Sequence, residues 1–147
     1  MKNLFYSLLL IVSTSCANAL NVAPASKITS VSGVPVSVNH IELGLVGDRI
    51  VRVIQHNMEL NPIVQVEILS RPDYKIINTT TIIELPFGEK NLNLKKSSGA
   101  FVEELSINDD HVNMVFEYFP LKGSSIMLSC NLAINTDEFS KLKCVSK

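Results

Sequence analysis

Apolar side chains recur at every second position through most of this chain. A period of two places alternate side chains on opposite faces of an extended strand, whereas an amphipathic helix needs a period of 3.6. The pattern therefore predicts β-strands with one buried face. The longest run of this kind lies near the C-terminus and predicts that Cys130 faces the core: Ile126, Leu128, Cys130, Leu132 and Ile134.

Residues that favour turns divide the pattern into short strands. Gly, Pro, Asn and Asp form turns because they accept positive φ, fix φ, or bond to their own backbone. Turns about every 8–12 residues are typical of β-sandwiches and barrels. We expect an all-β fold, either an antiparallel β-sandwich or a small β-barrel, of about eight or nine short strands. The expected turns are residues 47–48, 61–62, 71–73, 86–88, 97–99, 108–110 and 120–124.

The first strand is expected to change face. Valines occupy alternate positions over residues 34–38, and the apolar residues of the segment 41–45 continue on the other parity. An extra residue in one strand of an antiparallel pair shifts the alternation by one position. The sequence therefore predicts a β-bulge near residues 39–40.

The C-terminal tail is the one place where the spacing allows a short helix. Thr136 is a residue type that caps helices, and Phe139 and Leu142 would then share one side of the helical turn. The fold prediction therefore includes a short C-terminal helix after the last long strand.

Residues 1–19 have the layout of a secretory signal peptide. Lys2 gives a positive start, residues 4–12 are almost all apolar, and an A-x-A sequence ends at Ala19. The apolar segment is shorter than the roughly 20 residues that cross a bilayer. We expect cleavage after Ala19, which leaves one secreted β-domain at residues 20–147. Within it, residues 20–33 are expected to form a loose N-terminal arm or an edge strand.

The cysteines fit an exported protein. Cys16 lies in the signal peptide, and a lipid anchor on it would need Leu, Val or Ile three residues earlier, where Ser13 stands. Cys130 and Cys144 remain as a pair in a chain bound for an oxidising compartment. Their spacing fits neither a C-x-x-C redox motif nor a zinc knuckle. They are expected to form a structural disulfide, which closes a loop of about 15 residues and adds about 3 kcal/mol.

Charge and hydropathy exclude some partners. The formal net charge is −1 for the whole chain and becomes −2 without Lys2. This balance gives no electrostatic basis for binding nucleic acid. The mature chain contains no second long apolar stretch, so no transmembrane segment is expected in it. No motif calls for a cofactor, and the sequence leaves the oligomeric state open.

Three residues could form a metal or acid–base site. His40 and Glu42 lie two apart, so they share one face of a strand, and His56 is a candidate third partner from the next turn. The alternative is two surface histidines and a solvated carboxylate. A small metal-dependent hydrolase is the function that such a site would imply.

A second polar cluster lies at an expected hairpin tip. Asp109, Asp110 and His111 could bind calcium weakly, because carboxylates are calcium ligands. Turns also favour Asp because its side chain hydrogen-bonds to its own backbone, so the cluster fits an ordinary turn equally well. The sequon Asn78-Thr79-Thr80 falls in an expected strand.

No catalytic motif is present. The chain has no G-x-S-x-G elbow, no H-E-x-x-H sequence and no phosphate-binding glycine loop. The leading prediction is therefore a non-enzymatic binding domain that acts in the periplasm of a bacterium or outside the cell. Its ligand would be a protein or a glycan, and an exposed strand edge could recruit a partner by adding a strand.

Two segments resemble bacterial inhibitors of c-type lysozyme, which are small exported β-barrels. Residues 92–100 contain a Ser-Gly turn, and residues 119–123 contain an aromatic residue followed by Lys-Gly. The resemblance implies that Ser98 and Lys122 would enter the lysozyme cleft and meet its catalytic carboxylates. The chain lacks the tryptophan expected before Lys-Gly. Inhibition of c-type lysozyme is the alternative function.

Overall fold

The computed structural model describes residues 37–147. The expected signal peptide, its cleavage site and the arm at residues 20–33 lie outside this range. Within it, the chain forms eleven β-strands and one short 3₁₀ helix. The same range contains no helix with the length and apolarity needed to cross a bilayer.

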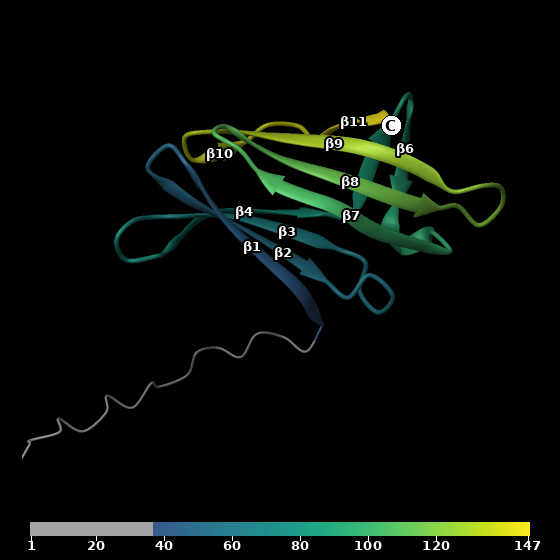
Figure 1. The fold of residues 1–147 in the computed structure, drawn as a ribbon, viewed down its shortest axis with the longest axis horizontal. Helices are drawn as coiled ribbons and strands as arrows, with labels where there is room; N and C mark the ends of the chain where they lie inside the picture. Colours follow the sequence, from purple (N-terminus) through teal and green to yellow (C-terminus); the bar gives the residue numbers. More distant parts are fainter. Residues whose placement is uncertain (1–36) are drawn as a thin grey trace, which may run out of the picture. The chain divides into compact units, whose positions relative to one another are not determined.

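The first sheet is a four-stranded antiparallel meander. Its strands lie in chain order, β1 (Val38–Val46), β2 (Arg49–His56), β3 (Val64–Leu69) and β4 (Ile76–Ile82). Gly47 makes the turn between β1 and β2 with φ of 58°, which glycine adopts without steric cost. This meander forms the blue and teal layer of Figure 1.

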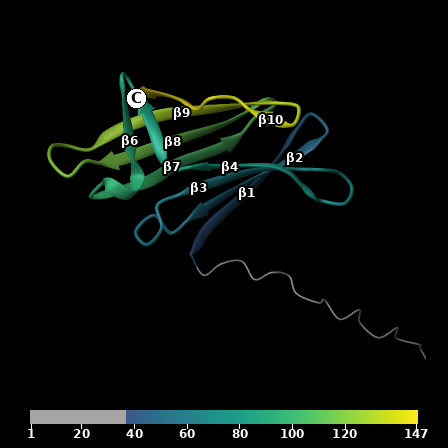
Figure 2. The same ribbon diagram turned by 180° about the vertical axis from the view of Figure 1, so that it is seen from behind.

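The second sheet is built around the longest alternating run. Its strands β7 (Gly99–Ile107), β8 (His111–Phe119) and β9 (Ile126–Asn135) form an antiparallel meander. Two short strands from the tail, β10 (Glu138–Phe139) and β11 (Lys143–Ser146), then pair with the free edge of β9. Figure 2 shows the tail running along β9 on this edge.

A small hairpin connects the two sheets. It consists of β5 (Glu84–Phe87) and β6 (Lys90–Asn93), and the 3₁₀ helix η1 (Leu94–Lys96) follows directly. Leu85 and Leu94 are almost fully buried, so each anchors its short element in the core. The hairpin therefore joins the two sheets while contributing to their common core.

The core lies between the sheets and is formed by alternate residues of the strands, as the period of two predicts. Cys130 is 1% exposed and faces this core, which confirms its predicted orientation. The architecture is all-β and sandwich-like, and the sheets of residues 37–147 do not close into a barrel. The first sheet contributes Val51, Val53, Val64, Val66 and Ile68, and the second contributes Val112, Met114, Phe116, Leu128, Cys130, Leu132 and Ile134.

The predicted C-terminal helix is wrong, because the tail forms β10 and β11 instead. Thr136 has a positive φ of 58°, whereas a helix N-cap has extended backbone. This angle turns the chain back sharply, so Glu138 pairs with Asn135 and β10 runs antiparallel to β9. The tail and the split of residues 74–85 into β4 and β5 also raise the strand count above the expected eight or nine.

The predicted bulge is present in β1. The register with β2 shifts between Val38 and His40, and regular pairing follows from Ile41 onward. The shift changes which parity faces the core. Leu43 and Leu45 therefore point away from the second sheet, whereas Val46 is buried.

Candidate functional site

A cleft of about 720 Å³ opens where three segments meet. One wall is the loop between β2 and β3, at residues 58–62, and the other is η1 with the two serines that follow it. Leu94, Phe101 and Phe119 supply its apolar surface. The lining exposes polar and apolar atoms in similar amounts, and concave sites of this kind are where ligands usually bind.

The loop wall is held in place by one asparagine. The side-chain oxygen of Asn57 accepts hydrogen bonds from the backbone N–H groups of Glu59 at 3.0 Å and Leu60 at 3.2 Å. Its backbone oxygen accepts another from the N–H of Asn61 at 2.8 Å. Asparagine side chains stabilise turns by this kind of local bond. The loop therefore presents Leu60, which is 80% exposed, from a fixed backbone.

The opposite wall is stabilised in a similar way. Asn93 caps η1, because its side-chain oxygen accepts a hydrogen bond from the N–H of Lys95 at 3.0 Å. The Ser97 hydroxyl donates to the Leu94 carbonyl at 2.7 Å. Ser98 is tied to the end of β8, since its backbone N–H donates to the Phe119 carbonyl at 2.8 Å.

An aromatic pair from neighbouring strands borders the cleft. The rings of Phe101 on β7 and Phe119 on β8 meet edge to face, with centroids 5.9 Å apart and an interplanar angle of 85°. This is a favourable arrangement for aromatic quadrupoles. Phe101 remains 39% exposed, so it offers a ring to a ligand while Phe119 limits its movement.

The two serine hydroxyls of the cleft are hydrogen-bonded to backbone carbonyls. A serine nucleophile needs a general base within hydrogen-bond reach. Both cleft hydroxyls instead donate to backbone carbonyls, Ser97 to Leu94 and Ser98 to Pro120. No histidine is among the residues that line the cleft. The lining offers one ammonium group, from Lys95, and one carboxylate, from Glu59.

The structure places Ser98 and Lys122 at the same end of the second sheet. The Ser98 hydroxyl donates to the Pro120 carbonyl at 3.2 Å, and Lys122 follows two residues later in the turn between β8 and β9. Both residues are exposed. Ser98 lines the cleft, whereas Lys122 is not among the lining residues.

The candidate metal site is not assembled. His40 and Glu42 do pair on one face of β1, with Nε2 and Oε2 3.2 Å apart. His40 lies opposite Gln55, so His56 as the next residue of β2 points to the other face. His56 is 8% exposed, its Nδ1 lies 3.0 Å from the Ser37 hydroxyl, and its Nε2 is buried without a hydrogen-bond partner.

The side-chain contacts of the hairpin-tip cluster are local, whereas the backbone carbonyl of Asp110 accepts a hydrogen bond from the N–H of Ile134 at 2.7 Å. A carboxylate oxygen of Asp110 lies against Nδ1 of the His111 ring, and the Asn108 amide lies 3.5 Å from Nε2 of the same ring. Across residues 37–147, no group of three His, Cys, Asp or Glu side chains could hold a metal ion. Asn78 of the sequon is a β4 strand residue, and its side chain donates to the Asp137 carbonyl at 2.9 Å.

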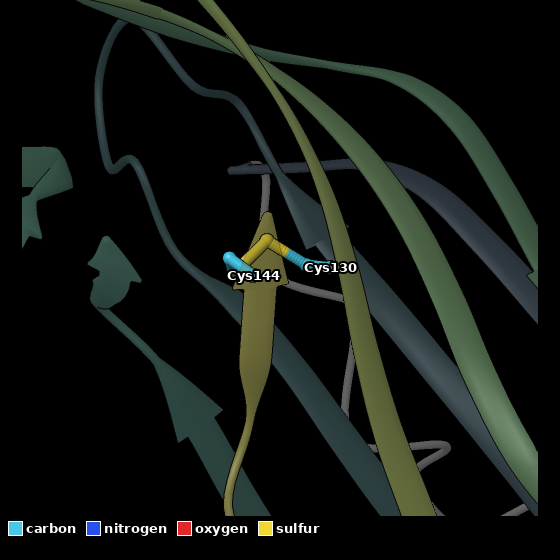
Figure 3. The surroundings of a disulfide bond; sticks show 2 residues. All are labelled: Cys130 and Cys144. Carbon is cyan, nitrogen blue, oxygen red and sulfur yellow. A yellow bond between two sulfur atoms is a disulfide. The ribbon is translucent and has the colours of Figure 1, made fainter. Parts of the chain in front are cut away.

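The disulfide fastens the tail to the core strand. Cys130 and Cys144 lie directly opposite each other in the pairing of β9 with β11, and their sulfur atoms are 2.01 Å apart. Figure 3 shows the bond between these two strands. The two cysteines therefore form the pair that the sequence predicts, and they pin β11 to the sheet edge.

A second fastening joins the first sheet to the turn after β9. The guanidinium of Arg49 donates through Nε to Asp137 at 2.6 Å. This hydrogen bond holds the pKa of the Asp137 carboxyl below its ordinary value and raises the pKa of Arg49. The pair is partly exposed, so it acts as a positional link more than as a large source of stability.

Sequence reasoning identified only part of the cleft. Ser98 was a candidate, but the loop at residues 58–62 and the Phe101–Phe119 pair were not. Their proximity depends on the register of β7 with β8, in which Gly99 lies opposite Phe119. No protein family, curated protein or solved structure matches the chain.

Proposed function

We propose that this chain is a non-catalytic binding domain that is exported and acts in the periplasm or outside the cell. The observation that carries the proposal is the cleft of about 720 Å³, whose walls are both fixed by backbone and side-chain hydrogen bonds. A pre-formed site loses little conformational entropy when a ligand binds. The hydroxyls of the cleft donate to carbonyls, so they can contact a ligand but lack a base to activate them.

The ligand class that fits the cleft is a protein segment or a glycan. The exposed ring of Phe101 can pack on an apolar side chain or on the face of a sugar. Lys95 and Asn61 offer donors at the rim for hydroxyl, carbonyl or carboxylate groups, and the Ser98 hydroxyl, which donates to Pro120, offers an acceptor. The expected signal peptide and the disulfide are consistent with a site outside the cytoplasm.

A matched pair of variants tests the cleft as the binding site. Phe101→Ser removes the exposed ring of the cleft, and Leu121→Ser removes an apolar side chain that is 75% exposed but lies outside it. Both would be screened on a glycan array, and each ligand found there would be titrated by calorimetry. A ligand of the cleft should bind the Phe101 variant at least about tenfold more weakly and the Leu121 variant normally. Equal binding by the Phe101 variant and the wild type would refute the site.

Inhibition of c-type lysozyme is the second candidate function. It is favoured by the shared position of Ser98 and Lys122, two exposed residues at one end of the second sheet. A lysine ammonium placed between carboxylates would block a glycosidase site. Ser98→Ala and Lys122→Ala should each weaken inhibition in a cell-wall lysis assay, whereas Lys141→Ala, elsewhere on the surface, should not. Full inhibition by both variants would exclude this role for the two residues.

Fractionation of the producing cells tests the compartment. The proposal predicts the protein in the periplasm or the medium, with an intact mass that begins at Leu20. Recovery in the membrane fraction with a lipid-modified Cys16 would contradict the expected cleavage site.

A further inference from the structure

Part of the outer face of the first sheet is apolar, where an antiparallel sheet normally presents polar residues to water. On β1 the outward positions are Ile41, Leu43 and Leu45. In the register, Leu45 lies opposite Ile50 of β2, which lies opposite Leu69 of β3. Together with Tyr74 from the next turn, these residues line one continuous shallow groove. We call the surface formed by Ile41, Leu43, Leu45, Ile50, Leu69 and Tyr74 the β1 face.

Several side chains of the β1 face are well exposed to solvent. Leu43 is 61% exposed, Leu45 58% and Tyr74 66%. Isolated exposed apolar residues need no explanation, but a contiguous apolar patch marks an interaction surface. Moreover, β1 is an edge strand, and proteins usually protect such strands with charged residues, lysine above all. The outward positions of residues 41–45 carry no charge at all.

The β1 face is also electrically neutral. Its one charged lining residue, Arg52, donates through Nε to Glu67 at 2.6 Å, and Gln65 donates to the other oxygen of the same carboxylate at 2.7 Å. Glu67 is only 3% exposed although it points to the outer face, so its charge is already covered and paired. A surface with a positive or a negative excess repels its own copy, whereas this one does not.

The exposed area has the size that a stable protein interface uses. Each of the exposed side chains at positions 41, 43, 45 and 74 leaves on the order of 100 Å² uncovered. The four together present roughly 400 Å². A standard interface takes about 800 Å² from each partner, of which somewhat more than half is apolar. The β1 face therefore supplies roughly the apolar part of one such interface.

We infer that the β1 face is the interface of a homodimer, with a second copy of this chain as its partner. A twofold axis places the same patch on both subunits, so the patch must be complementary to itself. A neutral and apolar sheet face meets this condition in charge and polarity, and two sheet faces can stack about 10 Å apart as the layers of a sandwich do. The inference does not depend on the cleft, whose lining residues are a separate set.

The test is the mass of the exported, purified protein in solution. Light scattering after size exclusion, over roughly 1–100 μM, should give twice the chain mass for the wild type. Leu43→Lys and Tyr74→Lys each place an ammonium group in the interface and should weaken the dimer roughly 10- to 100-fold. Leu121→Lys makes the same substitution at a residue that is 75% exposed in the turn between β8 and β9. This control should remain dimeric.

Two further readouts keep the test decisive. Far-UV circular dichroism and thermal melting should show that Leu43→Lys and Tyr74→Lys are both folded. Apolar association is not screened by salt, so the dimer should persist in 1 M NaCl. A wild-type monomer at 100 μM would overturn the inference and leave the β1 face to a different partner. A dissociation constant that both lysine variants leave unchanged, or a dimer that salt dissociates, would overturn it as well.

Discussion

Gly44 of β1 allows the two sheets to approach each other more closely than any side chain there would permit. A Cβ atom at this position would lie 2.6 Å from Cγ2 and 2.7 Å from Cβ of Ile107 on β7. These distances are about 1 Å inside normal carbon–carbon contact. Gly44→Ala must therefore push β1 away from β7, and overpacking of this kind costs about 1–3 kcal/mol. Alanine also lowers the conformational entropy of the unfolded chain, which stabilises the folded state by roughly 0.4–1 kcal/mol. The variant should therefore lose about 1–2 kcal/mol of its free energy of unfolding.

Gly99 provides a matched control for this prediction. A Cβ atom there would find its nearest neighbour, a ring carbon of Phe101, at 3.6 Å, which is ordinary contact. Gly99→Ala should therefore be neutral or slightly stabilising. Urea unfolding followed by far-UV circular dichroism gives both values, since the chain has no tryptophan. The Gly44 variant should also melt roughly 4–8 °C below the wild type.

A double-mutant cycle identifies Ile107 as the source of the strain. Ile107→Ala removes Cγ2 and Cδ1, the atoms at 2.6 and 3.2 Å, and keeps Cβ at 2.7 Å. The relief is then partial, and we expect the double variant to be about 1 kcal/mol more stable than the sum of the two single losses predicts. Additive losses, or a Gly44 variant as stable as the Gly99 variant, would refute the close approach.

Three further predictions concern the fastenings of the fold. Replacement of both Cys130 and Cys144 by alanine should cost about 3 kcal/mol in urea unfolding, and reduction of the wild type should reproduce this loss. Asp137→Asn removes a carboxylate whose pKa is lowered by its hydrogen bond with Arg49, so the variant should be less stable than the wild type at pH 7. The difference should fade as the pH falls below the ordinary aspartate pKa of about 3.9 and through the lowered value, as pH-dependent melting would show. Asn57→Ala should cost about 1 kcal/mol and speed hydrogen exchange at the two amides that its side chain accepts from, whereas unchanged exchange would argue against this role.

The second sheet was predictable because its signals agree. The run from Ile126 to Ile134 alternates strictly and is bounded by turns, so strand type, length and the buried face follow from the sequence. The structure buries Leu128 and Cys130 as expected. Local pattern and tertiary packing favour the same conformation here, which is the condition under which sequence reasoning succeeds.

The tail was not predictable, because its structure depends on partners that are distant in sequence. Phe139 and Leu142 have a spacing that suits a helix, but the positive φ of Thr136 and the pairing of Cys144 with Cys130 hold the tail extended along β9. Similarly, alternation over residues 41–45 revealed a strand and a change of parity. It could not reveal which parity faces the core, because both the inner and the outer positions of a strand can be apolar.

If both proposals hold, the dimer formed through the β1 face should bind a polymeric ligand through two clefts. A homodimer carries two clefts, so a polymeric ligand such as a long glycan can occupy both at once. The second binding event is then intramolecular, and avidity can exceed the affinity of one cleft by about 10²–10⁴. Leu43→Lys, which lies outside the cleft, should therefore keep the wild-type affinity for a short soluble ligand and lose retention on the immobilised polymer. If binding to the short ligand and to the polymer were weakened equally, residue 43 would affect the cleft itself. If neither were weakened, each polymer chain would bind one cleft at a time.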